Sequence, residues 1–163
     1  MNSMRIGLAL ALGLFAAGAN AAQTEAERAT LGWPEASRKT AAAMVEKYGQ
    51  PDAYTPTRVE WRDRGAFKRI AVNGTPNAPG ILENTAAYAV PADGIGLLSL
   101  RDCYVVPDKG AAELTAYGAS EDRNVRGLDL AEKVLRGELS VEQARKKTRR
   151  TDDPFDYVHN TAD

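Results

Sequence analysis

The sequence predicts an α+β fold: an antiparallel sheet of about five strands, with one N-terminal helix and two C-terminal helices packed on one face. Three observations support this class. A helical repeat of apolar residues comes first, alternating strand-like segments joined by short turns fill the middle, and two more helical repeats follow. Helices at both ends of the chain can then cover the same face of the sheet. These elements form a single domain, residues 34–150.

The first helix is expected over Pro34–Tyr48. Ala41 and Met44 belong to an apolar stripe at helical spacing, and proline suits the first helical position because its missing N–H has no partner there. Gly49 is expected to cap the end of the helix, and Pro51 prevents the helix from continuing. Residues 22–33, which precede it, are expected to form a flexible lead-in or a short frayed helix.

Five segments in the middle of the chain have the alternation or composition of strands. In the first of them Trp61 alternates with charged residues, and Asp63–Gly65 suits a three-residue hairpin loop. That loop would place Trp61 opposite Phe67 and Glu60 opposite Lys68. The expected strands are residues 55–62, 66–72, 81–90, 103–106 and 112–117, while 96–100 fits either a helical turn or a short strand.

Two helices are expected after the last strand. Ser120 is suited to begin the first, and Gly137 to end it. Ser140–Gln143 has the pattern of a capping box and predicts a second helix that runs to about Arg150. The apolar stripe of the first helix consists of Val125, Leu128, Ala131, Val134 and Leu135.

The N-terminus has the parts of a secretory signal peptide. Arg5 precedes the apolar run Ile6–Ala17, and the small residues that follow predict cleavage between Ala21 and Ala22. A membrane anchor is the alternative, but the run is shorter than the roughly 20 residues that span a bilayer. We therefore expect residues 1–21 to be removed and the product to be periplasmic, or extracellular.

Charge and cysteine content exclude several classes of function. The chain carries 21 Lys and Arg against 22 Asp and Glu, without the concentrated basic face that nucleic-acid binding needs. No second apolar run is long enough to span a membrane, so a soluble product is expected. Cys103 is the only cysteine, which excludes an intramolecular disulfide and a lipid on the mature N-terminus. Its strand-like surroundings favour a buried side chain over a reactive thiol.

The polar tail, residues 151–163, holds the single histidine of the chain, His159. A terminal tail is a poor place to hold catalytic geometry, so we assign no catalytic, metal-binding or cofactor-binding residue and expect no cofactor. Phe155 and Tyr157 are candidate partner contacts, or else they dock back on the sheet. The basic run Arg145–Arg150 is expected to be a solvated helix end, with an anionic partner as the alternative.

Six short stretches give the chain a family likeness over residues 34–150. The sequence resembles a group of small exported proteobacterial proteins of unknown function. Since that group has no known activity, the resemblance implies no functional residue. The stretches are Met44–Pro51, Val59–Arg62, Phe67–Arg69, Leu82–Thr85, Tyr88–Pro91 and Leu139–Arg145.

The sequence therefore predicts an exported binding module rather than an enzyme. The leading hypothesis is a non-enzymatic periplasmic domain that binds a partner protein or contributes structurally. The second is a carrier of a small ligand or lipid, because a helix packed on a curved antiparallel sheet can enclose an apolar cavity. The third is a hydrolase that uses paired carboxylates, which chance pairs among 22 acids support only weakly.

Overall fold

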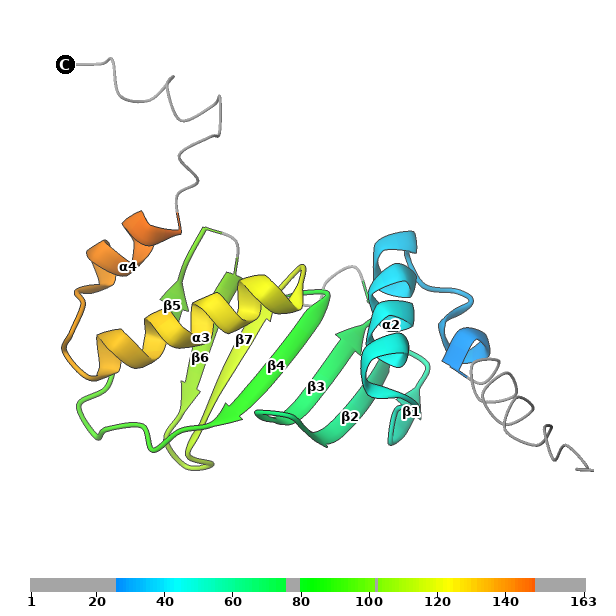
Figure 1. The fold of residues 1–163 in the computed structure, drawn as a ribbon, viewed down its shortest axis with the longest axis horizontal. Helices are drawn as coiled ribbons and strands as arrows, with labels where there is room; N and C mark the ends of the chain where they lie inside the picture. Colours follow the sequence, from blue (N-terminus) through cyan, green and yellow to red (C-terminus); the bar gives the residue numbers. More distant parts are fainter. Residues whose placement is uncertain (1–25, 76–79, 102, 149–163) are drawn as a thin grey trace, which may run out of the picture.

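The computed structural model describes residues 26–75, 80–101 and 103–148 (Figure 1). They form one seven-stranded sheet in the order β1-β2-β3-β4-β7-β6-β5, and every neighbouring pair of strands is antiparallel. The strands are β1 Ala53–Thr55, β2 Arg58–Arg64, β3 Phe67–Asn73, β4 Leu82–Ala87, β5 Leu98–Ser99, β6 Cys103–Asp108 and β7 Glu113–Gly118.

The helices lie on one face of this sheet. Figure 1 shows α2 (Glu35–Tyr48) in front of the β1–β3 end and α3 (Glu121–Leu135) running across β4, β7 and β6. The third helix, α4 (Val141–Lys147), packs against α3. A further helical turn covers residues 26–30, which is one of the two forms expected for the lead-in.

The α+β class and the antiparallel sheet are confirmed, but the expected count of about five strands is wrong. The two additional strands are the edges of the sheet, three-residue β1 and two-residue β5. A turn at Pro56–Thr57 separates β1 from β2, so residues 55–62 are not one strand. The segment 96–100 contains β5, the second of the two forms expected for it. Strands this short carry too few residues for a period of two to be visible.

The hairpin between β2 and β3 is also found, although its predicted register is wrong. Trp61 pairs with Ile70, and Glu60 with Ala71, three residues further along β3 than predicted. The turn is tight, with Gly65 at a φ of 59°. This register brings apolar side chains of both strands together on the helix-covered face. The hydrophobic pattern of the whole strand pair therefore decides the register.

The helix termini follow the sequence closely. Gly49 has a φ of 78° and its N–H donates to the carbonyl of Val45. The predicted capping box is present at Ser140 and Gln143, where each side chain accepts a hydrogen bond from the backbone N–H of the other. The expected apolar stripe of α3 is wrong at one position, because Val125 is 47% exposed.

A tryptophan from the lead-in ties the N-terminal segment to the sheet. The Trp33 indole N–H donates to the carbonyl of Pro56 over 2.8 Å. Its ring lies against Gly74, where a Cβ atom would come within 2.2 Å of the indole. Only glycine fits under the ring, so the turn after β3 and the segment before α2 are packed together.

Candidate functional site: the helix-free face of the sheet

Alternation of side chains along each strand gives the sheet two different faces. On one face Trp61 donates its indole N–H to Gly49 at the end of α2, and Asn84 contacts Asn124 of α3. None of the described helices packs on the other face, which we call the helix-free face. The strand registers place on it Arg58, Glu60, Arg62, Arg69, Ala71, Asn73, Glu83, Thr85, Tyr104, Val106, Thr115 and Tyr117.

An arginine–carboxylate pair spans β2 to β4 on the helix-free face. The Arg58 guanidinium binds the Glu83 carboxylate through two parallel hydrogen bonds of 2.7 and 2.8 Å. The Asn73 amide donates to the same carboxylate at 2.7 Å and accepts from Arg58 at 3.2 Å. Burial opposes the charge on Arg58, yet the hydrogen bonds and the charge of Glu83 leave its pKa raised. Three neighbouring strands thereby form one charged network.

A second carboxylate extends this network toward β1. Glu60 lies 2.9 Å from Nε of Arg62 and 3.6 Å from Nε of Arg58. Its charge raises the pKa of Arg62, first through their hydrogen bond and then through the attraction between them. Arginines therefore hold both carboxylates, Glu60 on β2 and Glu83 on β4, in fixed positions.

Arg69 differs from these two arginines. Its Nη2 donates to the Thr85 hydroxyl at 3.3 Å, and that hydroxyl shares a 3.0 Å hydrogen bond with Thr115. Its Nε is buried and has no hydrogen-bond partner in the structure. Among the described residues no carboxylate forms an ion pair with Arg69. Arg62 lies directly opposite it on β2, so two cations are neighbours here.

Two stacked tyrosines occupy the β6–β7 part of the helix-free face. The rings of Tyr104 and Tyr117 lie 5.8 Å apart at an interplanar angle of 27°, and both are partly exposed. Burial raises the pKa of Tyr117, and the negative charge of Glu83 raises it further. Arg58 and Arg69 act in the opposite direction, which places this hydroxyl within reach of the charged network.

A cavity of about 470 Å³ opens beside the tyrosine pair, at the ends of β6 and β7. Backbone and small residues form much of its wall, together with both aromatic rings. Its lining includes Gly80, Ser99, Arg101, Tyr104, Tyr117 and Gly118. The cavity therefore makes one edge of the helix-free face concave.

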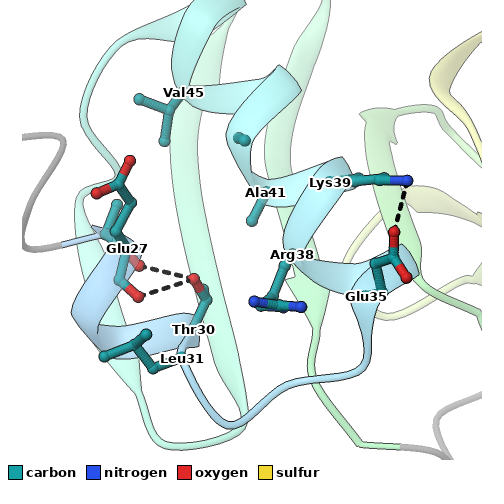
Figure 2. Close-up of a pocket in the computed structure, with 10 residues that line it drawn as sticks. Glu27, Thr30, Leu31, Glu35, Arg38, Lys39, Ala41 and Val45 are labelled. Atoms are coloured by element: carbon teal, nitrogen blue, oxygen red, sulfur yellow. Dashed lines mark hydrogen bonds and ion pairs between the residues drawn. The ribbon is translucent and has the colours of Figure 1, made fainter.

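A second hollow lies away from the sheet, between the 26–30 turn and the outer side of α2, and has a volume of about 550 Å³. Figure 2 shows Leu31, Ala41 and Val45 around it, with the Thr30 hydroxyl bonded to backbone carbonyls of its own helical turn. Glu35 and Lys39 form an ion pair of 2.7 Å at its rim. This groove has an apolar floor and a charged margin.

Of the residues singled out from the sequence, Cys103 is described by the structure, and it contributes to the wall of the cavity at the ends of β6 and β7. Ala21, Ala22, Phe155, Tyr157 and His159 all lie outside the described residues. Cys103 is buried on the helix-covered face, where a Cβ at Gly127 of α3 would approach its Sγ to 2.5 Å. A thiol in that position is packed as a small apolar side chain.

The charged network itself was not predicted. The charges at 58, 60 and 62 alternate with apolar residues, which indicates only a polar strand face. Glu83 lies 25 positions away from Arg58 in the sequence, on another strand. Their pairing therefore depends on the register and order of the strands. An excess of arginine on the polar side of these strands is the one signal that points to this face.

No known protein family, no characterised protein and no solved structure matches this chain. Over the described ranges, no group of three or more His, Cys, Asp and Glu side chains is arranged to hold a metal ion. Nor does any helix in that part of the chain have the length and apolar character needed to cross a membrane.

Proposed function

We propose that this chain is an exported periplasmic domain that binds a partner protein through the helix-free face of its sheet. Residues 1–21 would direct export. The observation that carries the proposal is the stacked pair Tyr104 and Tyr117 beside the arginines of β2 and β3. Tyrosine and arginine are the residue types that dominate the binding energy of protein interfaces.

The exposed and partly exposed side chains of β6 and β7 on this face favour a large partner over a small one. Val106 of β6 is 37% exposed, and it lies in register with Thr115 in the same polar-aromatic surface. The surface extends over β2, β3, β4, β7 and β6, so its contacts are spread over five strands. Protein interfaces have this breadth, whereas small ligands are enclosed in a cleft.

The state of the carboxylates favours binding over catalysis. Glu83 accepts from Arg58 and Asn73, and Glu60 accepts from Arg62. A general acid or base must be able to reach a substrate, whereas these two carboxylates already bind neighbouring arginine and asparagine side chains. These acids therefore fit the role of fixing the arginine side chains, which pre-organises the surface for a partner.

Site-specific photocrosslinking tests the proposal. A photoreactive phenylalanine analogue at Val106 reports on the helix-free face, and the same analogue at Val125 on α3 is the matched control. Both valines are exposed, at 37% and 47%, and they lie on opposite layers of the domain. In the cells that make the protein, we expect a discrete crosslinked species from position 106 and none from position 125.

Variants at the tyrosine pair test whether the crosslinked partner binds through the helix-free face. Replacing Tyr104 and Tyr117 by alanine should abolish the species seen from position 106, because the aromatic contacts supply much of the interface energy. Equal crosslinking from positions 106 and 125, or crosslinking that survives the double replacement, would contradict binding through this face. Fractionation of the same cells checks that the protein reaches the periplasm.

The groove beside α2 supports a second candidate, a carrier of a small apolar ligand. Its volume of about 550 Å³ lies within the usual range for small-ligand sites. Ala42 lines the groove, and Ala43 is an exposed neighbour on α2 that does not. Native mass spectrometry of protein taken from its own periplasm should show a bound mass that Ala42→Trp removes and Ala43→Trp retains. If every spectrum shows only the mass of the protein without a ligand, the carrier hypothesis is wrong.

A further inference from the structure

We propose that the partner presents an acidic side chain to Arg69 at the centre of the helix-free face. The inference rests on the proposed function, because it names the chemistry of the protein that binds this surface. It concerns one contact, in which a carboxylate of the partner binds the guanidinium of Arg69 on β3, the strand between β2 and β4.

The charges of the helix-free face point to this arginine. Glu83 binds Arg58 in a bidentate pair, and Glu60 binds Arg62 at 2.9 Å. No ion pair joins Arg69 to a described acid, and it lies directly opposite Arg62. The two arginines repel each other across the strands, so a carboxylate brought to Arg69 gains from both.

The geometry of Arg69 also leaves it incompletely satisfied. A guanidinium has five N–H donors, and here one Nη donates to Thr85 at 3.3 Å while the buried Nε has no acceptor. A desolvated donor without an acceptor is unfavourable. The planar fork of arginine matches the two oxygens of a carboxylate, so a small rotation that presents the fork to an acid would satisfy it.

The surroundings of Arg69 identify the source of the carboxylate as a protein. On the same face, Tyr117 lies two strands away from Arg69 on β7, and Tyr104 and Val106 lie one strand further on β6, where they offer aromatic and apolar contact. An extended segment that alternates apolar and acidic side chains fits both features together. Inorganic phosphate would use the arginine alone and gain nothing from the rings.

Two matched peptides test this contact by NMR. One is an acetylated, amidated repeat of three Leu-Glu units, and the other replaces every Glu by Gln. The reporters are the Nε–H signal of Arg69, assigned by its loss in Arg69→Lys, and the signals of Tyr104 and Tyr117. Inorganic phosphate is titrated in parallel. Arg126→Gln, on the exposed side of α3, serves as the control for loss of an arginine elsewhere.

We expect the Leu-Glu peptide to shift the Arg69 and tyrosine signals in a saturable way, at least about tenfold more tightly than its Gln twin. Arg69→Gln should weaken the Leu-Glu peptide by a similar factor, and Arg126→Gln should leave it unchanged. Because Arg69→Gln also removes a contact to Thr85, charge reversal provides an independent check. Arg69→Glu should bind a Leu-Lys repeat and reject the Leu-Glu repeat.

Three outcomes would overturn the inference. If the Glu and Gln peptides bind equally well at the tyrosine pair, the face binds a peptide but does not require an acidic side chain. A response to phosphate as strong as the response to the peptide would identify a free-anion site instead. If neither peptide shifts the signals of Arg69, Tyr104 or Tyr117, an acidic segment does not bind this face. The crosslink at position 106 decides the proposed function separately.

Discussion

Two adjacent rows of side chains cross the same strands and have opposite characters. The helix-covered row is fully buried and apolar apart from one amide: Trp61, Ile70, Asn84, Ala116 and Val105. The row one residue along each strand lies on the helix-free face: Glu60, Ala71, Glu83, Tyr117 and Tyr104. The strands are identical in the two rows, so the difference comes only from which side chains the alternation places on each face.

The difference separates what folds the protein from what is available for binding. On the covered row, helices exclude water and the stabilisation comes from apolar burial. On the helix-free face, long polar side chains form their own layer, and Ala71 and Thr85 are buried there without a helix above them. Charged pairs at a partly exposed surface contribute little to stability. The helix-free row is therefore free to be specialised for recognition.

Trp61 gives the largest expected difference between the faces. It is fully buried, and its indole N–H donates to Gly49 at 2.9 Å. Trp61→Ala should lower the free energy of unfolding by about 3–5 kcal/mol through lost burial and the cavity left behind. Urea denaturation checks this value.

A tyrosine of the helix-free row is the matched control. Tyr117→Ala removes a ring of comparable chemistry that is only partly buried, so it should cost clearly less than Trp61→Ala. If the two replacements cost the same, the helix-free face would be part of the stabilising core, and the separation of roles would be wrong.

The buried amide pair is the next test, because it is the polar exception on the covered row. The Asn124 amide donates to Asn84 at 2.8 Å and to the carbonyl of Leu82 at 2.9 Å. The remaining donor of Asn84 and the remaining acceptor of Asn124 are buried and unpaired. Asn124→Ala should therefore cost about 2–3 kcal/mol, since it leaves Asn84 buried without its donor.

Removing both amides should largely reverse that loss. In the double variant Asn84→Val and Asn124→Ala, the two buried orphan groups disappear together, and valine suits a strand while alanine suits a helix. We expect stability within about 1 kcal/mol of the wild type. If the loss of stability in the double variant equals the sum of the losses in the two single variants, the two amides are not coupled.

The charged network should respond more weakly. Glu83→Gln leaves Arg58 without its bidentate partner, but Arg58 is 29% exposed and still reaches Glu60 and water. The expected cost is about 1–2 kcal/mol. Glu113→Gln, which breaks a pair with the half-exposed Lys68, is the control and should cost less than about 0.5 kcal/mol. A loss above 3 kcal/mol for Glu83→Gln would place this pair among the determinants of folding.

The covered face was largely predictable from the sequence and the helix-free face was not. Helical spacing, Gly49 and the capping box at Ser140 are local signals, and they fixed the helices to within a few residues. The register of the β2–β3 hairpin was missed because Gly65 allows more than one turn geometry, and only the pairing of both strands decides between them. Local patterns locate elements, while packing between elements sets their alignment.

The candidate site depends on that alignment throughout. Arg58 meets Glu83 because β3 pairs with both β2 and β4, and Tyr104 meets Tyr117 because β6 pairs with β7. The pairing of β4 with β7 then joins the two groups on one face. No short motif contains these residues, so a search for spaced catalytic or metal-binding patterns passes over them. What the sequence does show is the alternation itself, which separates a polar face from an apolar one before the strands are paired.

The ionisation of Tyr117 gives the smallest effect and the sharpest test of the helix-free face. Burial and then the charge of Glu83 raise the pKa of Tyr117 above its ordinary value of 10.0, whereas Arg58 and Arg69 lower it, and Tyr104 adds a minor upward contribution. The neutral phenol is thus favoured by folding. Its contribution to stability is complete below pH 10 and is lost as the pH rises through the folded-state pKa.

Variants of the charged neighbours should move this pKa in opposite directions. Arg69→Gln removes a positive charge and should raise the pKa of Tyr117, while Glu83→Gln removes a negative charge and should lower it. Carbon-13 NMR of the labelled ring carbon that bears the hydroxyl measures both shifts, with Tyr117→Phe assigning the signal. Arg126→Gln on α3 should change nothing. Shifts of one sign in both charge variants would mean that Tyr117 responds to altered burial, and that it does not share an electrostatic environment with Arg69 and Glu83.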